Sequence, residues 1–163
     1  MEQNLSKKTR TESDLIGSRE VPESALYGVQ TLRGIENFRI SKFHLNEYPL
    51  FIQALPITKM GATIANRELD LLTEEQADAI LRACKEILEG KHHEQFPVDM
   101  IQGGAGTTTN MNANEVIANR ALELMGHQRG EYQFCSPNDH VNRSQSTNDA
   151  YPTAIHIGLY YTH

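Results

Sequence analysis

The chain has 163 residues, 39% of them hydrophobic, and a net charge of −6, which fits one ordinary domain and argues against a general nucleic-acid binder. No apolar run reaches the ~20 residues that span a membrane, and residues 1–14 lack the apolar stretch of a secretory signal. Cys84 and Cys135 form no metal-type cluster, and so few cysteines indicate a reduced, cytoplasmic protein.

The N-terminal part is the least regular. Residues 1–13 are polar, and we expect them to be a flexible, frayed terminus. Residues 14–38 mix glycines and a proline with short apolar steps, which predicts turns and leaves room for a short hairpin. We assign residues 14–145 to one helical domain and residues 146–163 to a separate helix that follows it.

Two helices are predicted in the first half of that domain. Residues 50–69 carry apolar side chains at helical spacing, and Pro56 should kink or restart that helix. Thr73 opens the second helix, because Thr73 and Gln76 have the spacing of a capping box. Gly90 is a natural residue to end it.

A glycine-rich loop covers residues 91–106. His92 and His93 raise the idea of a metal site, but adjacent residues do not face the same way and no third ligand follows at a useful spacing. We therefore expect no metal there. The glycines do not match a phosphate-binding loop, although they permit close approach of the backbone to a ligand or another segment.

A third helix is predicted from about Thr109 to Met125, with Gly126 at its end. Asparagine is unusual inside a helix because its side chain competes for backbone hydrogen bonds. We therefore expect side-chain partners for the four asparagines of this segment, which are Asn110, Asn112, Asn114 and Asn119.

Residues 136–149 are almost entirely polar and lead into a last helical pattern. Ser146 is a candidate N-cap, and Asp149 lies three residues on, as in a capping box. A helix N-terminus has unpaired N–H groups and partial positive charge, so Ser146, Thr147 and Asn148 would form a compact site for a small anion such as a carboxylate. The alternative is that these residues only cap the helix.

The last helix is predicted from Asn148, with Pro152 in its first turn. Its apolar pattern is still running at His163, where no capping residue stands. We interpret this as a helix cut mid-way, whose exposed apolar face would favour association.

Three stretches of the chain are long and specific: VPESALYGVQTLRGIENF, GGAGTTTNMNANEVIANRALE and SPNDHVNRSQSTNDAYPTAIHI. Together they resemble the aspartase/fumarase superfamily. The resemblance implies a mainly α fold, in which an N-terminal helical domain with a possible short β-hairpin precedes the start of a central helical bundle. It also implies a homotetramer. Residues 136–140 are similar to the aspartases, whereas fumarases more often place His before Pro-Asn-Asp.

The family reaction is reversible elimination to give fumarate, and in aspartases ammonia leaves L-aspartate. Its aci-carboxylate intermediate carries two negative charges and needs fixed donors around it. Thr107, Ser146 and Thr147 match family positions that hold this carboxylate, and Asn148 matches one that helps hold the amino group. Thr108 stands where aspartases commonly have Ser.

The resemblance places Asn138, Asp139 and His140 in a family loop, for which we expect a structural or secondary-site role. By residue type alone, Asp139 or His140 could instead be a general base. The family's Thr-His segment and its Ser-Ser-x-Met-Pro-x-Lys loop, with the serine base, do not occur in this sequence. We therefore expect no catalytic residue here and no activity from this chain alone.

The resemblance implies no required cofactor and leaves activation of the parent enzyme by a divalent cation such as Mg²⁺ open. Its implied partners are L-aspartate and fumarate, with neither nucleic acid nor membrane. Two alternatives to an ammonia-lyase stay open: a fumarate hydratase of the same superfamily, and a non-catalytic binding or assembly module.

Overall fold

The computed structural model describes residues 8–162 and confirms a mainly α fold with one small antiparallel sheet. One-turn helices at Leu45–Glu47, His93–Gln95 and Pro137–Val141 lie in the connections. The longer elements, in chain order, are β1 (Thr9–Asp14), β2 (Gly17–Pro22), α1 (Val29–Asn37), α2 (Pro49–Glu68), α3 (Glu74–Leu88), α4 (Thr107–Leu124) and α5 (Thr147–Tyr160).

The hairpin begins earlier than expected. β1 pairs with β2 from Thr9 opposite Pro22 to Asp14 opposite Gly17, so the prediction of a frayed segment is wrong for residues 9–13; residues 1–7 lie outside the described residues. The strand escaped notice because its inward-facing residue is charged. Glu12 is buried and accepts hydrogen bonds from the Val29 amide and the Tyr132 hydroxyl, both at 2.9 Å.

α1 lies within residues 14–38, where turns were predicted. It has only nine residues, and Gly34 interrupts its apolar pattern. A buried carboxylate caps it from outside. Glu115 of α4 accepts from the amides of Gly28 at 2.8 Å and Thr31 at 3.0 Å, and from the Thr31 hydroxyl at 2.6 Å. The start of α1 is therefore fixed by tertiary contact more than by its own sequence.

α2 is a single helix that continues through Pro56, so it does not restart there. Pro56 is buried, and α2 packs against both α3 and α5, which holds the turns on either side of the proline together. α3 begins as predicted. Gln76 N donates to Thr73 Oγ1 and Thr73 N donates to Gln76 Oε1, both at 3.2 Å. Gly90 follows its end with a φ of 88°.

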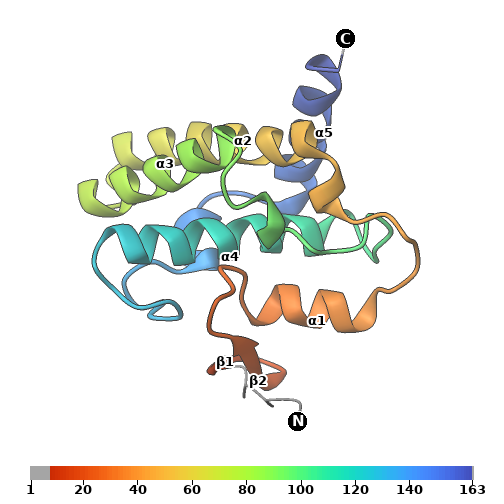
Figure 1. Cartoon of the computed structure of the whole chain (residues 1–163). Helices are drawn as coiled ribbons and strands as arrows, with labels where there is room; N and C mark the ends of the chain where they lie inside the picture. The colour runs from red at the N-terminus through yellow and green to blue at the C-terminus, as the bar shows by residue number, and fades with distance from the viewer. Residues whose placement is uncertain (1–7, 163) are drawn as a thin grey trace.

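α4 is the centre of the fold. Figure 1 shows it between the α2–α3 pair and α1. Each of its four asparagines donates from its side chain to another residue, as expected from their placement inside a helix. The main core is formed by side chains of α2, α3 and α4, including Ile52, Leu55, Ile80, Ile87, Val116, Ile117 and Leu122.

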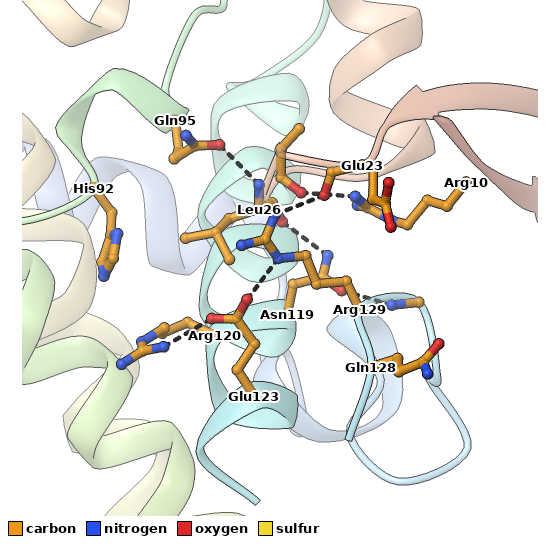
Figure 2. Close-up of polar contacts among 12 residues, drawn as sticks. Arg10, Glu23, Leu26, His92, Gln95, Asn119, Arg120, Glu123, Gln128 and Arg129 are labelled. Carbon is orange, nitrogen blue, oxygen red and sulfur yellow. Dashed lines mark hydrogen bonds and ion pairs between the residues drawn. The ribbon is translucent and has the colours of Figure 1, made fainter. Parts of the chain in front are cut away.

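The C-terminal half of α4 holds the N-terminal segment in place (Figure 2). Asn119 Nδ2 donates to the Leu26 carbonyl at 2.8 Å, and the Leu26 amide donates to Gln95 Oε1 at 2.8 Å. Arg129 Nε donates to Glu123 Oε1 of α4 at 2.7 Å, and Arg129 Nη1 donates to the Glu23 carbonyl at 2.7 Å. These contacts lie at the opposite end of α4 from its N-terminus.

α5 starts at Thr147, one residue earlier than predicted, and Ser146 is its N-cap. Pro152 lies in its second turn, not its first, because the helix starts before the apolar pattern does. Figure 1 shows the last turns of α5 extending beyond α2. Among residues 8–162, no helix has the length and apolar character needed to cross a membrane.

Candidate functional site

The N-terminal ends of α4 and α5 meet. Asn110 Nδ2, in the first turn of α4, donates to Thr147 Oγ1 of α5 at 3.1 Å. Gly106 precedes α4 with a φ of 81°, and a Cβ atom at this position would overlap the ring of Tyr151 on α5. Glycine is therefore required here both for its backbone conformation and for the close approach of the two helices.

Four predicted binding residues lie on these two helix starts. Thr107, Ser146 and Asn148 are exposed, and Thr147 is half-buried. None carries a charge, so the site consists of neutral hydroxyl and amide groups at two helix N-termini, each with partial positive charge. Such an arrangement can bind a carboxylate without presenting a competing charge.

The N-terminal end of α4 is capped by the side chain of Gln102, in the preceding loop. Thr109 N donates to Gln102 Oε1, and Gln102 Nε2 donates to Thr109 Oγ1, both at 2.8 Å. Among residues 8–162, the amides of Thr107 and Thr108 keep no protein acceptor. The Thr108 side chain packs its methyl group against Gly34 of α1, so this methyl group contributes to the packing of the two helices.

The start of α5 is capped by Ser146, whose Oγ accepts from the Asn148 amide at 3.2 Å. The second half of the predicted capping box is absent from the described residues, because the Asp149 side chain makes no hydrogen bond to the Ser146 amide. Among residues 8–162, the Ser146 hydroxyl only accepts, from the Asn148 amide, so its proton is free to donate to a ligand. Asp149 is exposed on the first turn.

A buried lysine lies beneath these helix starts. Lys59 of α2 is 1% exposed, and its Nζ donates to Asn110 Oδ1 at 2.7 Å, to Asn142 Oδ1 at 3.0 Å and to Gln145 Oε1 at 3.0 Å. Burial lowers the pKa of the Lys59 ammonium to about 7.

Sequence reasoning missed Lys59. Its position in the helix offered a signal, because it follows Ile52 and Leu55 at the spacing of the buried face. A charged residue on a core face needs polar partners, and these come from segments far along the chain.

The first part of the polar loop before α5, residues 136–140, is bonded mainly within itself. Ser136 Oγ accepts from the amides of Asn138 and Asp139 at 3.2 and 3.1 Å, and Ser136 N donates to His140 Nδ1 at 2.7 Å. Burial lowers the pKa of the His140 imidazole. These contacts favour a structural role for the loop, and a secondary site at Asn138 and Asp139, which are exposed, stays a prediction.

The two adjacent histidines have local partners. His92 Nε2 lies 3.0 Å from Glu86 Oε2, and His93 Nε2 lies 2.9 Å from the Ile87 carbonyl. Within the described part of the chain, no three His, Cys, Asp or Glu residues are grouped in a way that could hold a metal ion. Cys84 is fully buried in the core, and burial raises the pKa of its thiol to about 12.

Comparisons with known proteins identify the family of the chain. Residues 17–163 match the family model described as Lyase. An aspartate ammonia-lyase of Helicobacter pylori is 60% identical over 151 residues, which is 93% of this chain and 32% of the relative. An aspartate ammonia-lyase of Escherichia coli (strain K12) is 55% identical over 157 residues, 96% of this chain and 33% of the relative. The chain thus spans about a third of the length of these relatives.

Solved structures show the same fold. A fumarate lyase:delta crystallin from Brucella melitensis, bound to cobalt, has a TM-score of 0.94 at 52% identity. The match covers 95% of this chain and 34% of the Brucella chain. A class II fumarase from Schistosoma mansoni has a TM-score of 0.87 at 36% identity, and the match covers 93% of this chain and 32% of the fumarase chain. The chain therefore belongs to the lyase family of the aspartase/fumarase superfamily.

Proposed function

We propose that this chain supplies part of the substrate site of a lyase that reversibly eliminates ammonia from L-aspartate to give fumarate. The observation that carries the proposal is the set of uncharged donors at the adjoining starts of α4 and α5. The aspartate ammonia-lyases of Helicobacter pylori and Escherichia coli, at 60% and 55% identity, support the choice of substrate.

The proposed chemistry explains why such donors are needed. Removing a proton next to an ionised carboxylate produces an aci-carboxylate with two negative charges, which must be stabilised where they develop. Thr107, Ser146 and Thr147 hold this group, and Asn148 helps to hold the amino group. Loss of one such donor typically costs about 3 kcal/mol in the transition state, which is roughly a 100-fold loss in rate.

The proton-abstracting base is proposed to come from outside residues 1–163. Among the described residues, no carboxylate or imidazole is hydrogen-bonded to the hydroxyl of Thr107, Ser146 or Thr147. We therefore propose that these residues alone release no ammonia and that the active enzyme is a cytoplasmic homotetramer. The proposed mechanism requires no cofactor, and whether a divalent cation such as Mg²⁺ activates the enzyme is decided by adding and chelating it.

The test is an assay of ammonia and fumarate on the protein as its organism produces it, with L-aspartate and L-malate as separate substrates. Fumarate with matching ammonia from L-aspartate is the expected result. Ser146→Ala should reduce this rate about 100-fold. Ser146→Ala also removes a helix cap worth about 1 kcal/mol of stability. The matched control is Thr73→Ala, which removes the cap of α3 far from the site and should leave the rate of fumarate formation unchanged.

A fumarate hydratase is the second candidate, favoured by the class II fumarase from Schistosoma mansoni, which has a TM-score of 0.87. Fumarate formed only from L-malate would move the proposal to that reaction. If neither substrate yields fumarate, both enzyme proposals are refuted, and a non-catalytic binding or assembly module is the alternative that stands.

A further inference from the structure

We infer that Lys59 is a positioning residue that fixes the hydrogen-bonding direction of Asn110 and thereby makes the Thr147 hydroxyl a donor toward the ligand. The inference rests on the proposed carboxylate site at the start of α5. It assigns a role to a buried group that does not itself reach that site.

The first step is the chemistry of the ammonium group. A lysine ammonium has three N–H donors and no acceptor. Lys59 Nζ lies within 3.0 Å of three side-chain amide oxygens, which belong to Asn110, Asn142 and Gln145. Each proton therefore has one acceptor, and each of the three amides must turn its oxygen toward the lysine.

The second step is the orientation of Asn110. Its Oδ1 is held by Lys59 at 2.7 Å, so its Nδ2 faces the other way. Nδ2 lies 3.1 Å from both Asn142 Oδ1 and Thr147 Oγ1. An amide nitrogen can only donate, so the Thr147 oxygen must accept this hydrogen bond.

The orientation of Asn142 supports the same assignment independently of the lysine. Asn142 Oδ1 also accepts from Asn114 Nδ2 at 3.2 Å, and Asn142 Nδ2 donates to the Gln145 carbonyl at 3.0 Å. With its oxygen fixed in this way, Asn142 can accept from Asn110 but cannot donate to it.

The third step concerns the one proton of the Thr147 hydroxyl. Because Asn110 supplies a proton to the Thr147 oxygen, the hydroxyl proton points elsewhere. No protein group among residues 8–162 accepts it. Thr147 is half-buried at the first position of α5, where a bound carboxylate would be the acceptor. Lys59 thus acts on the ligand through Asn110 and Thr147, in addition to filling a buried position.

Asn110→Asp separates this role from a purely structural one. The aspartate has nearly the same shape and still accepts from Lys59, but its second oxygen can no longer donate to Thr147. The Thr147 hydroxyl would then turn inward to this oxygen. We expect fumarate to bind about 10- to 100-fold more weakly, as for a lost hydrogen bond to a charged group, while thermal unfolding shows that the variant is folded.

The control for the added negative charge is the same substitution in a Thr147→Val background. If the effect of Asn110→Asp passes through the Thr147 hydroxyl, it should disappear in this background. Asn119→Asp is the control for a buried amide changed to a carboxylate elsewhere on α4, and its folded form should bind fumarate as the wild type does.

The experiment is calorimetric titration of fumarate into the whole protein and its variants at pH 6, where Lys59 carries its charge. Equal affinity of Asn110→Asp and wild type would overturn the inference, and so would an undiminished effect in the Thr147→Val background. A wild type that does not bind fumarate would instead refute the proposed function. Neutron diffraction of the wild type at pH 6 gives a second test that needs no variant: the deuteron on Thr147 Oγ1 should point away from Asn110, and one directed at Asn110 refutes the inference.

Discussion

Replacing Lys59 with methionine should change how the free energy of unfolding depends on pH. Burial lowers the pKa of this ammonium from the ordinary 10.5 to about 7. In the unfolded chain the group returns to its ordinary pKa, so between these two values the unfolded state binds more protons. Stability therefore rises with pH across this window. At ~1.4 kcal/mol per pH unit, the whole window corresponds to about 5 kcal/mol.

The assay is urea unfolding, followed by circular dichroism, of the wild type and of Lys59→Met between pH 7 and 9.5. Other groups titrate in both proteins, so the difference in their free energies of unfolding isolates Lys59. The neighbouring Cys84 thiol has its pKa raised to about 12 by burial and stays neutral throughout. We expect the wild type to gain about 3 kcal/mol relative to the variant between pH 7 and 9.5.

A difference between the two proteins that stays flat across this range would refute the reasoning. It would mean that Lys59 keeps its charge in the folded protein, with the three amide oxygens offsetting the loss of hydration. The removal of the lysine from those oxygens also destabilises the variant, but this contribution does not depend on pH in the same window.

Two further predictions concern the fold around the site. Glu115→Ala should lower the free energy of unfolding by about 3 kcal/mol or more, since it leaves the buried donors at the start of α1 without their acceptor. A loss of stability under ~1 kcal/mol would contradict this capping role. Gly106→Ala should lower the melting temperature and weaken fumarate binding, because its Cβ would overlap Tyr151. Gly61→Ala in α2, where a Cβ meets no neighbour within 4 Å, is the control and should stabilise by ~1 kcal/mol; similar effects of both substitutions would contradict the packing argument.

The elements that could be predicted from sequence carry their signals locally. α3 has its capping box at Thr73 and Gln76 and its terminating glycine at Gly90, and all three act as expected. The first strand of the hairpin and α1 could not be recognised, because they are held by long-range contacts of charged side chains. Glu12 bonds to Val29 and Tyr132, and a carboxylate of α4 caps α1.

The residues of the candidate site could be predicted from the sequence, but their arrangement in space could not. The hydroxyl and amide residues at the start of α5 could be proposed from their chemistry, and the family resemblance added Thr107. The meeting of the two helix starts, which depends on Gly106 against Tyr151, could not be inferred from either segment alone. The role of Lys59 likewise depends on the amide oxygens that the folded chain brings to it.

The most direct test of the account is a crystal structure of the whole protein, as its organism produces it, with fumarate bound. The account predicts that one carboxylate of fumarate lies within hydrogen-bonding distance of the hydroxyls of Thr107, Ser146 and Thr147. Fumarate bound elsewhere, with these three hydroxyls facing only water, would contradict the assignment of the site.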